Sequence, residues 1–367
     1  MSLQEALESC LHQGISAVIF PGAAMAVCKD GEIITVATAG KATYLDWAPE
    51  ITENSIFDLA SLTKPLVTGL ATAALYAKGI IGLDDPVSKY FQPSNPVWKN
   101  ITIRHLLLHT SGLPAHRPFY KIVFSMPEEM RRSQVVKSIL ATPIQAPPEE
   151  KTLYSDLGFI LLGSIIEKIT SLRLDHAWKK LVQRPLALDE LFFSPVPAQG
   201  LDLANVVPTE YCPFRKKIIW GEVNDLNCWA LGGVAGHAGL FGTIKGVAKA
   251  IGKIFDIYKN DYEDSPIPAA AVRLFLEPVE NKDRTFRALG FDVPSLKASQ
   301  AGTYFTNGRS VGHLGFTGTS FWLDLEKGIA MVLLSNRTFP HHTEEKQKAM
   351  AQFRAHIHDV AWKKLSF

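Results

Sequence analysis

The sequence predicts an α+β fold in which strands from both ends of the chain form one antiparallel sheet around an inserted, mainly helical region. Strand-like segments occur near the N-terminus and again in the last third of the chain, whereas the residues between them alternate helical patterns with Pro- and Gly-rich connections. The chain has 367 residues, of which 47% are hydrophobic, and can bury a large core. We expect a discontinuous sheet subdomain (1–78 and 285–367) and a helical subdomain (79–284) that meet at the functional site.

The first elements are predicted from turn and helix-end signals. Residues 23–28 and 33–37 are apolar segments on either side of Asp30-Gly31, a sequence typical of a β-hairpin turn. Residues 66–78 have the pattern of a helix, and Gly79 follows at the position where helices commonly end in the left-handed conformation. Ser61 therefore lies next to the last element before the helical insertion.

The later elements follow from hydrophobic periodicity. Apolar residues at helical spacing predict helices in the insertion and at the C-terminus, and short hydrophobic or alternating segments between turn signals predict strands. The expected helices cover 103–109, 135–140, 157–170 and 346–364, and the expected strands cover 288–293, 311–316, 320–325 and 329–335.

Charge and cysteine usage exclude several function classes. A formal net charge of +2 gives no bias toward nucleic acid or an anionic membrane. The four cysteines are too few and too scattered for a disulfide framework, and no two of them form a Cys-x-x-Cys, which argues against zinc and thioredoxin-like sites. We expect no metal and no cofactor. The cysteines are Cys10, Cys28, Cys212 and Cys228.

The N-terminal residues do not have the pattern of a secretory signal, because they lack a basic start followed by a long apolar stretch. The most apolar segment, residues 159–166, is too short to span a bilayer. We expect a cytoplasmic protein if Met1 is the natural start, and an exported or periplasmic one otherwise. The sequence does not indicate an oligomeric state.

The strongest chemical signal is the sequence Ser61-Leu62-Thr63-Lys64. Residues three apart on a helix share one face, with about 5–6 Å between their Cβ atoms. An amine at that distance can activate a hydroxyl that is otherwise a poor nucleophile. Because a Ser-x-x-Lys sequence occurs by chance about once in a chain of this length, the interpretation of Ser61 depends on the other segments.

Two further segments contain suitable groups. Tyr154 lies just before the predicted helix 157–170, where its phenol could transfer protons, although most tyrosines are simply half-buried. His313 lies in a glycine-containing strand that a substrate could approach closely. A backbone N–H of that strand and the N–H of Ser61 would form an oxyanion hole. The structural alternative is a packed histidine in a glycine-rich turn.

Together these segments resemble the three motifs of the serine β-lactamase and DD-peptidase superfamily. Ser61-x-x-Lys64, Tyr154-x-Asp156 and His313-x-Gly315 occur in the expected order, and residues 83–87, 103–113 and 231–241 also resemble conserved segments of the family. The similarity covers most of the chain from about residue 20 to residue 340 and is greatest to the class C-like group, which includes esterases and D-amino-acid peptidases. It implies a β-lactamase/transpeptidase-like fold.

The resemblance also implies roles for individual residues. Ser61 would attack an acyl carbon and form a covalent acyl-enzyme, and Lys64 would assist its deprotonation. Tyr154 would pass a proton to the leaving group, and whether Lys64 or Tyr154 is the base stays open. His313 would occupy the basic position of the third motif. The backbone N–H groups of Ser61 and Phe316 would bind the oxyanion.

Departures from the family pattern narrow the expected substrate. Where β-lactamases of this group usually have Lys-Thr-Gly, this chain has His313-Leu314-Gly315, which weakens recognition of a substrate carboxylate. Asp156 replaces a frequent asparagine and can only accept hydrogen bonds when ionised. We therefore expect a peptidase or esterase acting on a small ester, amide or D-amino-acid peptide, with inefficient β-lactam hydrolysis. The expected substrate contacts are Asp156, Leu314, Gly315, Asp225 and Asn227, the last two from a segment that is otherwise a solvated turn.

Two alternatives remain. His105 and His109 stand four residues apart, but Leu106 replaces the glutamate of a metalloprotease motif, so these histidines are expected to pack against their helix end. The altered third motif also permits a catalytically slow penicillin-binding or sensor protein of the same fold. If neutral His313 is required, activity is expected to rise between about pH 6 and pH 7.

Overall fold

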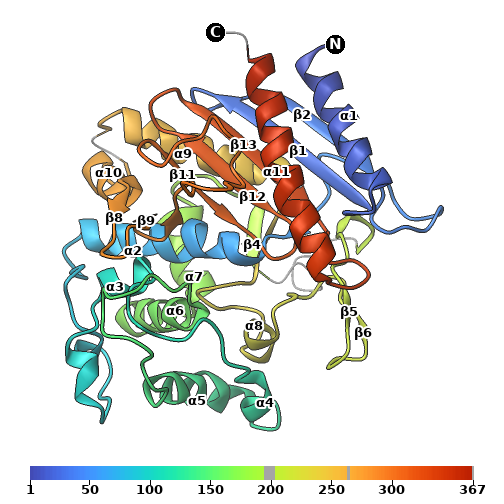
Figure 1. Ribbon diagram of the computed structural model, residues 1–367. Coiled ribbons are helices and arrows are strands. Elements are labelled where there is room, and N and C mark those ends of the chain that lie inside the picture. The colour runs from blue at the N-terminus through green and yellow to red at the C-terminus, as the bar shows by residue number, and fades with distance from the viewer. Residues whose placement is uncertain (194–202, 263–264, 366–367) are drawn as a thin grey trace.

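An antiparallel sheet of eight strands, counted within the described residues, draws on both ends of the chain (Figure 1). The structure is a computed structural model that describes residues 1–193, 203–262 and 265–365. In spatial order the strands are β2 (Glu32–Gly40), β1 (Gly22–Lys29), β13 (Ile329–Ser335), β12 (Ser320–Asp324), β11 (Ser310–Leu314), β10 (Phe291–Asp292), β9 (Phe286–Ala288) and β8 (Val279–Glu280). The predicted N-terminal hairpin is confirmed by β1 and β2, and β1 also pairs with β13.

Alternating side chains give this sheet two buried faces. In β1, Met25 and Val27 pack with α1 (Leu3–Ser16) and α11 (Glu344–Lys364), whereas Ala26 and Cys28 face α9 (Ile244–Lys259). Because the side-chain period of a strand is two, each face receives its own hydrophobic cluster. Figure 1 shows α1 and α11 side by side across one face of the sheet.

The remaining elements lie mostly in the lower half of Figure 1, and α6 (Asp156–Thr170) is buried along most of its length. No helix within the described ranges is long and apolar enough to cross a membrane. The other α-helices are α2 (Leu70–Ala77), α3 (Ile103–Leu107), α4 (Tyr120–Val123), α5 (Glu128–Leu140), α6 (Asp156–Thr170), α7 (Leu174–Trp178), α8 (Leu226–Ala230) and α10 (Ala269–Leu276).

Short strands and turns complete the fold. The strands β3 (Phe57–Asp58), β7 (Leu240–Gly242) and β4 (Leu191–Phe193) form a small sheet, and β5 (Tyr211–Cys212) pairs with β6 (Lys217–Ile218). The short helical turns are Ala60–Leu62, Lys64–Gly69, Val87–Lys89, Pro96–Lys99, Lys179–Gln183 and Leu203–Asn205.

The predicted α+β class, with an antiparallel sheet from both termini, is confirmed. The expected strand 288–293 is instead two short strands, because Gly290 adopts φ +88° and turns the chain between β9 and β10. The expected helix 66–78 begins earlier, with a wide turn over Lys64–Gly69 that leads into α2. Helices α1, α4, α7, α8, α9 and α10 have no counterpart among the expected elements.

The predicted subdomain division stays a prediction. Two elements within its helical part, 79–284, contact the sheet: α9 packs on β1 and β13, and β8 is an edge strand. The sheet layer therefore includes chain from before residue 285.

Ile357 offers a direct test of how α11 is held. Its side chain is fully buried between α11 and the sheet. Ile357→Ala should lower the free energy of unfolding by about 2–5 kcal/mol, because a large-to-small change in a core leaves a cavity. The exposed Gln352 of the same helix supplies the control, since Gln352→Ala should change stability by less than about 0.5 kcal/mol. Urea unfolding of both variants measures this, and equal stability of the two would contradict the packing.

Candidate active site

The turn that carries Ser61 is fixed by buried hydrogen bonds to the Asp58 carboxylate, one from within the turn and one from a distant part of the chain. The Asp58 carboxylate accepts the N–H groups of Ala60 (2.8 Å) and Asn224 (2.7 Å). Burial nevertheless raises the pKa of Asp58 to about 6. Ala60 adopts φ +48°, so the chain bends sharply before it enters the helical turn containing Ser61. The sequence Asp58-Leu59-Ala60 thus sets the direction in which Ser61 points.

Lys64 is fully buried, and its ammonium group has three acceptors. Its Nζ lies 3.0 Å from the Ser61 Oγ, 2.8 Å from an Asp156 carboxylate oxygen and 3.2 Å from the His237 carbonyl oxygen. Burial alone would lower the pKa of Lys64, but Asp156 and then Tyr154 together outweigh it, and the pKa is raised. The resting protein therefore holds Lys64 as a charged donor to Ser61.

Asp156 begins α6 and faces the same cluster. Burial raises the pKa of its carboxyl group, but Lys64 and then His116 outweigh this effect, and the net shift is downward. The second carboxylate oxygen lies 3.6 Å from the His116 Nδ1. The carboxylate stays ionised at neutral pH and forms an ion pair with Lys64. Its contact with a substrate stays a prediction.

Tyr154 lies in a ring of cationic and aromatic groups. The Lys64 Nζ is 4.7 Å from the centroid of the Tyr154 ring, and the Arg287 guanidinium carbon is 5.8 Å from it. The rings of His109 and His313 have centroids 4.6 Å and 5.9 Å away. Burial raises the pKa of Tyr154, although Lys64 partly opposes it, so the phenol is neutral at pH 7.

His313 lies on β11 and is 1% exposed. Its Nδ1 lies 2.9 Å from the Leu314 carbonyl oxygen. Because a carbonyl can only accept, this nitrogen carries the proton. The other nitrogen lies 4.0 Å from Asp292. Burial lowers the pKa of His313 to about 4, although Asp292 opposes it. With this pKa His313 is already neutral at pH 6, so His313 itself would cause no rise in activity between pH 6 and pH 7; the pH profile stays a prediction.

The turn after β11 is fastened to the Ser61 segment. The Thr317 hydroxyl donates to the Asp58 carbonyl oxygen (2.8 Å), and the Thr319 hydroxyl donates to the Leu59 carbonyl oxygen (3.1 Å). These bonds bring the backbone of Phe316 close to that of Ser61, and both residues line one cavity. The assignment of their N–H groups to an oxyanion hole stays a prediction.

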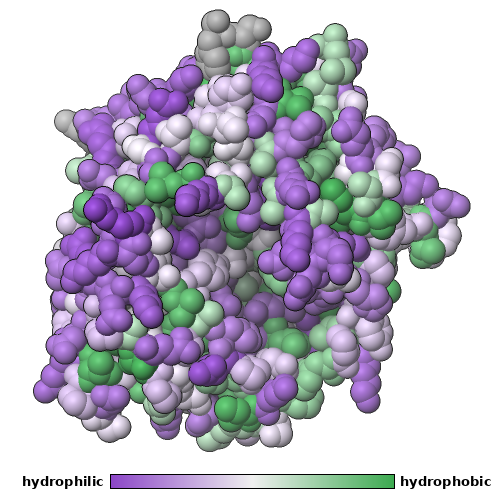
Figure 2. Space-filling view, viewed as in Figure 1, coloured by the Kyte–Doolittle hydropathy of each residue, from purple (hydrophilic) through white to green (hydrophobic). Residues whose placement is uncertain are grey.

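That cavity has a volume of about 830 Å³. Figure 2 shows the surface hollowed near the middle of this face. Lys64 and His313 are buried behind its wall. The expected site residues that line it are Ser61, Tyr154, Asp156, Asp225, Leu314, Gly315 and Phe316.

Asn227 does not reach this cavity. It is 1% exposed, its side-chain oxygen accepts the Tyr120 N–H (2.9 Å), and its amide donates to the Arg117 carbonyl oxygen (2.9 Å). Asn227 is therefore a structural residue rather than the expected substrate contact. Asp225 lines the cavity and caps α8, and one of its oxygens lies 2.9 Å from the His237 Nε2.

Several residues at the site belong to none of the three sequence motifs. Arg287 on β9 and Asp292 on β10 form an ion pair beside Tyr154. Burial raises the pKa of Asp292, but Arg287 and then His313 outweigh it and lower the pKa overall. The His109 ring lies against Tyr154 at a tilt of 36°, and its Nδ1 accepts the Ser155 N–H (3.0 Å). These contacts depend on the tertiary arrangement, so local spacing cannot reveal them.

His105, by contrast, lies away from the site. Its Nδ1 accepts the Thr102 N–H, and its other ring nitrogen lies 3.1 Å from Glu149. In the described part of the chain no three His, Cys, Asp or Glu side chains are grouped to hold a metal ion. All four cysteines are buried and unpaired.

Comparison with known proteins assigns the chain to a family. The family model described as Beta-lactamase matches residues 7–355. Proteins provisionally named D-alanyl-D-alanine carboxypeptidase are similar: one from Escherichia coli strain K12 is 29% identical over 352 residues, and one from Salmonella heidelberg strain SL476 is 30% identical over 355 residues. Each alignment covers 88% of this chain and 79% of the relative.

Solved structures share the fold. The octameric penicillin-binding protein homologue from Pyrococcus abyssi has a TM-score of 0.74 at 20% identity, over 98% of this chain and 77% of that one. EstCE1, a hydrolase with promiscuous acyltransferase activity, has a TM-score of 0.75 at 19% identity, over 98% of both chains. These likenesses confirm the predicted β-lactamase/transpeptidase-like fold, and with the family match they show that the chain belongs to the Beta-lactamase family.

Proposed function

We propose that this protein is a serine hydrolase of the class C-related group that cleaves a small ester or amide through an acyl-enzyme on Ser61. The observation that carries the proposal is the position of the buried Lys64 ammonium, whose Nζ lies 3.0 Å from the Ser61 Oγ. Ser61 in turn lines the cavity that a substrate can enter. The names of the relatives, which concern a carboxypeptidase and a hydrolase with acyltransferase activity, support an ester or peptide substrate.

The charged state of Lys64 favours a particular proton path. Lys64 donates to the Ser61 oxygen and stabilises the negative charge that develops there. The Tyr154 oxygen accepts the serine proton while its own proton passes to the leaving group. Tyr154 is therefore a neutral phenol before and after the step, and no other residue has to act as the base. A bond forms between the Ser61 Oγ and the acyl carbon, and the bond to the leaving group breaks. Water then repeats the path in reverse and releases the acid.

The cleft contains cations that can replace the missing third-motif lysine. Arg337 and Arg354 line it, and neither guanidinium has a carboxylate within ion-pair distance among the described residues. Arg337 contacts the His342 ring, and Arg354 donates to uncharged oxygens of Gln300, Gly315 and Thr319. Burial lowers the pKa of Arg337 to about 10 and that of Arg354 to about 9. Because these buried cations have neutral partners but no counter-charge, a substrate carboxylate near them is favourable. This supports a peptide or acid-bearing ester over a neutral lipid ester.

The rival is a protein that acylates and then releases product very slowly. The intact Ser61, Lys64 and Tyr154 cluster favours turnover. A time course with a short-chain activated ester distinguishes the two, since repeated turnovers support the hydrolase and a single stoichiometric burst supports the sensor.

Ser61→Ala should reduce hydrolysis of that ester by more than about 1,000-fold, because it removes the nucleophile. The exposed Ser133 provides a matched control, and Ser133→Ala should leave the rate unchanged. Steady-state rates of both variants, with circular dichroism to confirm folding, check this. Retained activity in Ser61→Ala would overturn the assignment.

Asp156→Asn tests whether Lys64 acts as a cation. Asp156 is the main group that raises the pKa of Lys64, so the substitution should lower that pKa. If activity requires charged Lys64, kcat/KM is lost at alkaline pH when Lys64 loses its proton, and this loss should occur at a lower pH in the variant. Measuring kcat/KM of both proteins from about pH 6 to pH 10 checks this. Asp189→Asn, at an exposed carboxylate, is the control. Higher activity of Asp156→Asn over this range would instead indicate neutral Lys64 as the base.

His313 leads to a prediction at acidic pH. With a pKa of about 4, His313 is neutral above that value and becomes charged below it. If the neutral ring is required beside Tyr154, kcat/KM should be flat from about pH 6 to pH 7 and fall as the pH drops through about 4. His313→Gln should remove this acidic limb. A limb centred near pH 6.5 in the native protein that His313→Gln removes would contradict the burial of His313, whereas a limb that persists in His313→Gln would belong to another group such as Asp58.

A further inference from the structure

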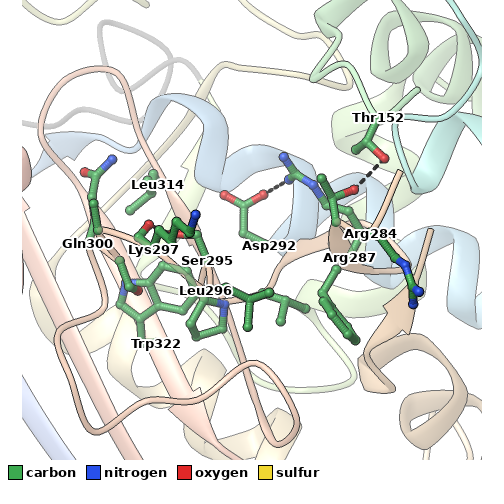
Figure 3. A pocket seen from close by; sticks show the side chains of 16 residues that line it. Thr152, Arg284, Arg287, Asp292, Ser295, Leu296, Lys297, Gln300, Leu314 and Trp322 are labelled. Carbon is green, nitrogen blue, oxygen red and sulfur yellow. Dashed lines mark hydrogen bonds and ion pairs between the residues drawn. The ribbon is translucent and has the colours of Figure 1, made fainter. Parts of the chain in front are cut away.

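A second pocket of about 520 Å³ adjoins the catalytic cavity. The two share four wall residues, namely Arg287, Asp292, Leu314 and Gln300. Residues 293–300 form the outer wall of the second pocket, and Figure 3 shows the Arg287–Asp292 pair and the side chains of Leu296 and Trp322 around the same space. A molecule bound at Ser61 can therefore extend past Leu314 into this pocket.

The sheet itself forms the floor of the pocket. Gly312 of β11 pairs with Trp322 of β12 and with Asp292 of β10, so these residues share one face. A Cβ on Gly312 would lie 2.4 Å from a ring atom of Trp322, which shows that the indole lies across the glycine. The Trp322 Nε1 is buried without a hydrogen-bond partner in the described structure. The floor is thus an apolar ring.

The rim combines an apolar side chain with a cation. Leu296 is 71% exposed although it borders the pocket. The neighbouring Lys297 is also exposed and forms no ion pair with an acidic side chain among the described residues. The other cations of the lining are already paired, Arg284 with Glu280 and Arg287 with Asp292. The pocket therefore offers apolar contact together with one available positive charge.

The position of the pocket identifies the part of the substrate that enters it. Tyr154, the proton donor to the leaving group in the proposed reaction, lies under the Arg287 guanidinium. Arg287 is also a wall of the second pocket. The leaving group consequently departs toward this pocket. The pocket volume falls within the range of about 300–1,000 Å³ that holds drug-sized ligands, which is more than a single small amino acid requires.

We propose that this second pocket binds the distal part of the leaving group, and that the substrates are esters or amides whose leaving group contains an apolar residue followed by a carboxylate. The proposal rests on the proposed hydrolase function and adds the substrate class. Leu296 and Trp322 contact the apolar residue, and Lys297 contacts the carboxylate.

Three esters with the same acetyl group test the proposal: O-acetyl-lactate, O-acetyl-lactyl-leucine and the C-terminal amide of the latter. The leucine compound should show a kcat/KM about ten-fold above that of O-acetyl-lactate, because an apolar side chain becomes buried. Its amide should be up to about five-fold poorer than the acid, because a solvated ion pair is lost. Equal values for all three would overturn the proposal.

Variants separate the two contacts. Leu296→Ser should reduce the ratio of kcat/KM between O-acetyl-lactyl-leucine and O-acetyl-lactate, and Lys297→Glu should reverse the preference for the acid over the amide. Lys99→Glu makes the same charge change at an exposed position outside both pockets and should leave both ratios unchanged. Ratios that do not differ between these variants and the native protein would contradict the assignment.

A binding measurement keeps this proposal distinct from the hydrolase function. Lactyl-leucine is titrated into Ser61→Ala by calorimetry, with and without Leu296→Ser or Lys297→Glu. Binding that these substitutions weaken supports the pocket even if no ester is hydrolysed, in which case only the hydrolase function fails. Absence of binding at millimolar concentration, or binding that the substitutions leave unchanged, overturns the pocket proposal.

Discussion

The buried ion pair between Lys64 and Asp156 is the interaction on which the site depends. Moving an ammonium group out of water is costly, and a fully buried lysine keeps its charge only where a carboxylate and further acceptors surround it. Asp156, the His237 carbonyl oxygen and the Ser61 hydroxyl supply these acceptors. The pair therefore fixes the protonation state of Lys64 and, through it, the way Ser61 can be activated.

The fold places these groups by joining segments that are far apart in sequence. Ser61 and Lys64 follow a short strand, Asp156 begins α6, and the turn carrying Phe316 belongs to the C-terminal strands. Hydrogen bonds from Thr317 and Thr319 to the carbonyl oxygens of Asp58 and Leu59 connect the first segment to the last. The antiparallel sheet from both termini is thus a requirement of the site, because it brings the C-terminal strands beside Ser61.

Sequence patterns predicted the parts of the site that are local. The spacing of Ser61 and Lys64 and the order of the three motifs are visible in the chain, and so is the strand that carries His313. The Arg287–Asp292 pair was not predictable, because two short strands on either side of Gly290 bring it to Tyr154. The signals for α1 are present, since Ser2 and Glu5 form a capping box, although no helix was expected there. Asn227 was predicted to contact substrate, but its side chain is hydrogen-bonded to the backbone of Tyr120 and Arg117 instead.

An acyl-enzyme on Ser61 that turns over can be trapped by rapid acid quenching after mixing with an activated acetyl ester, followed by peptide mass mapping. We expect one acetyl group on the peptide that contains Ser61, present during turnover and absent once the ester is consumed. An acetyl group on another residue, or one that persists after the ester is gone, would contradict it.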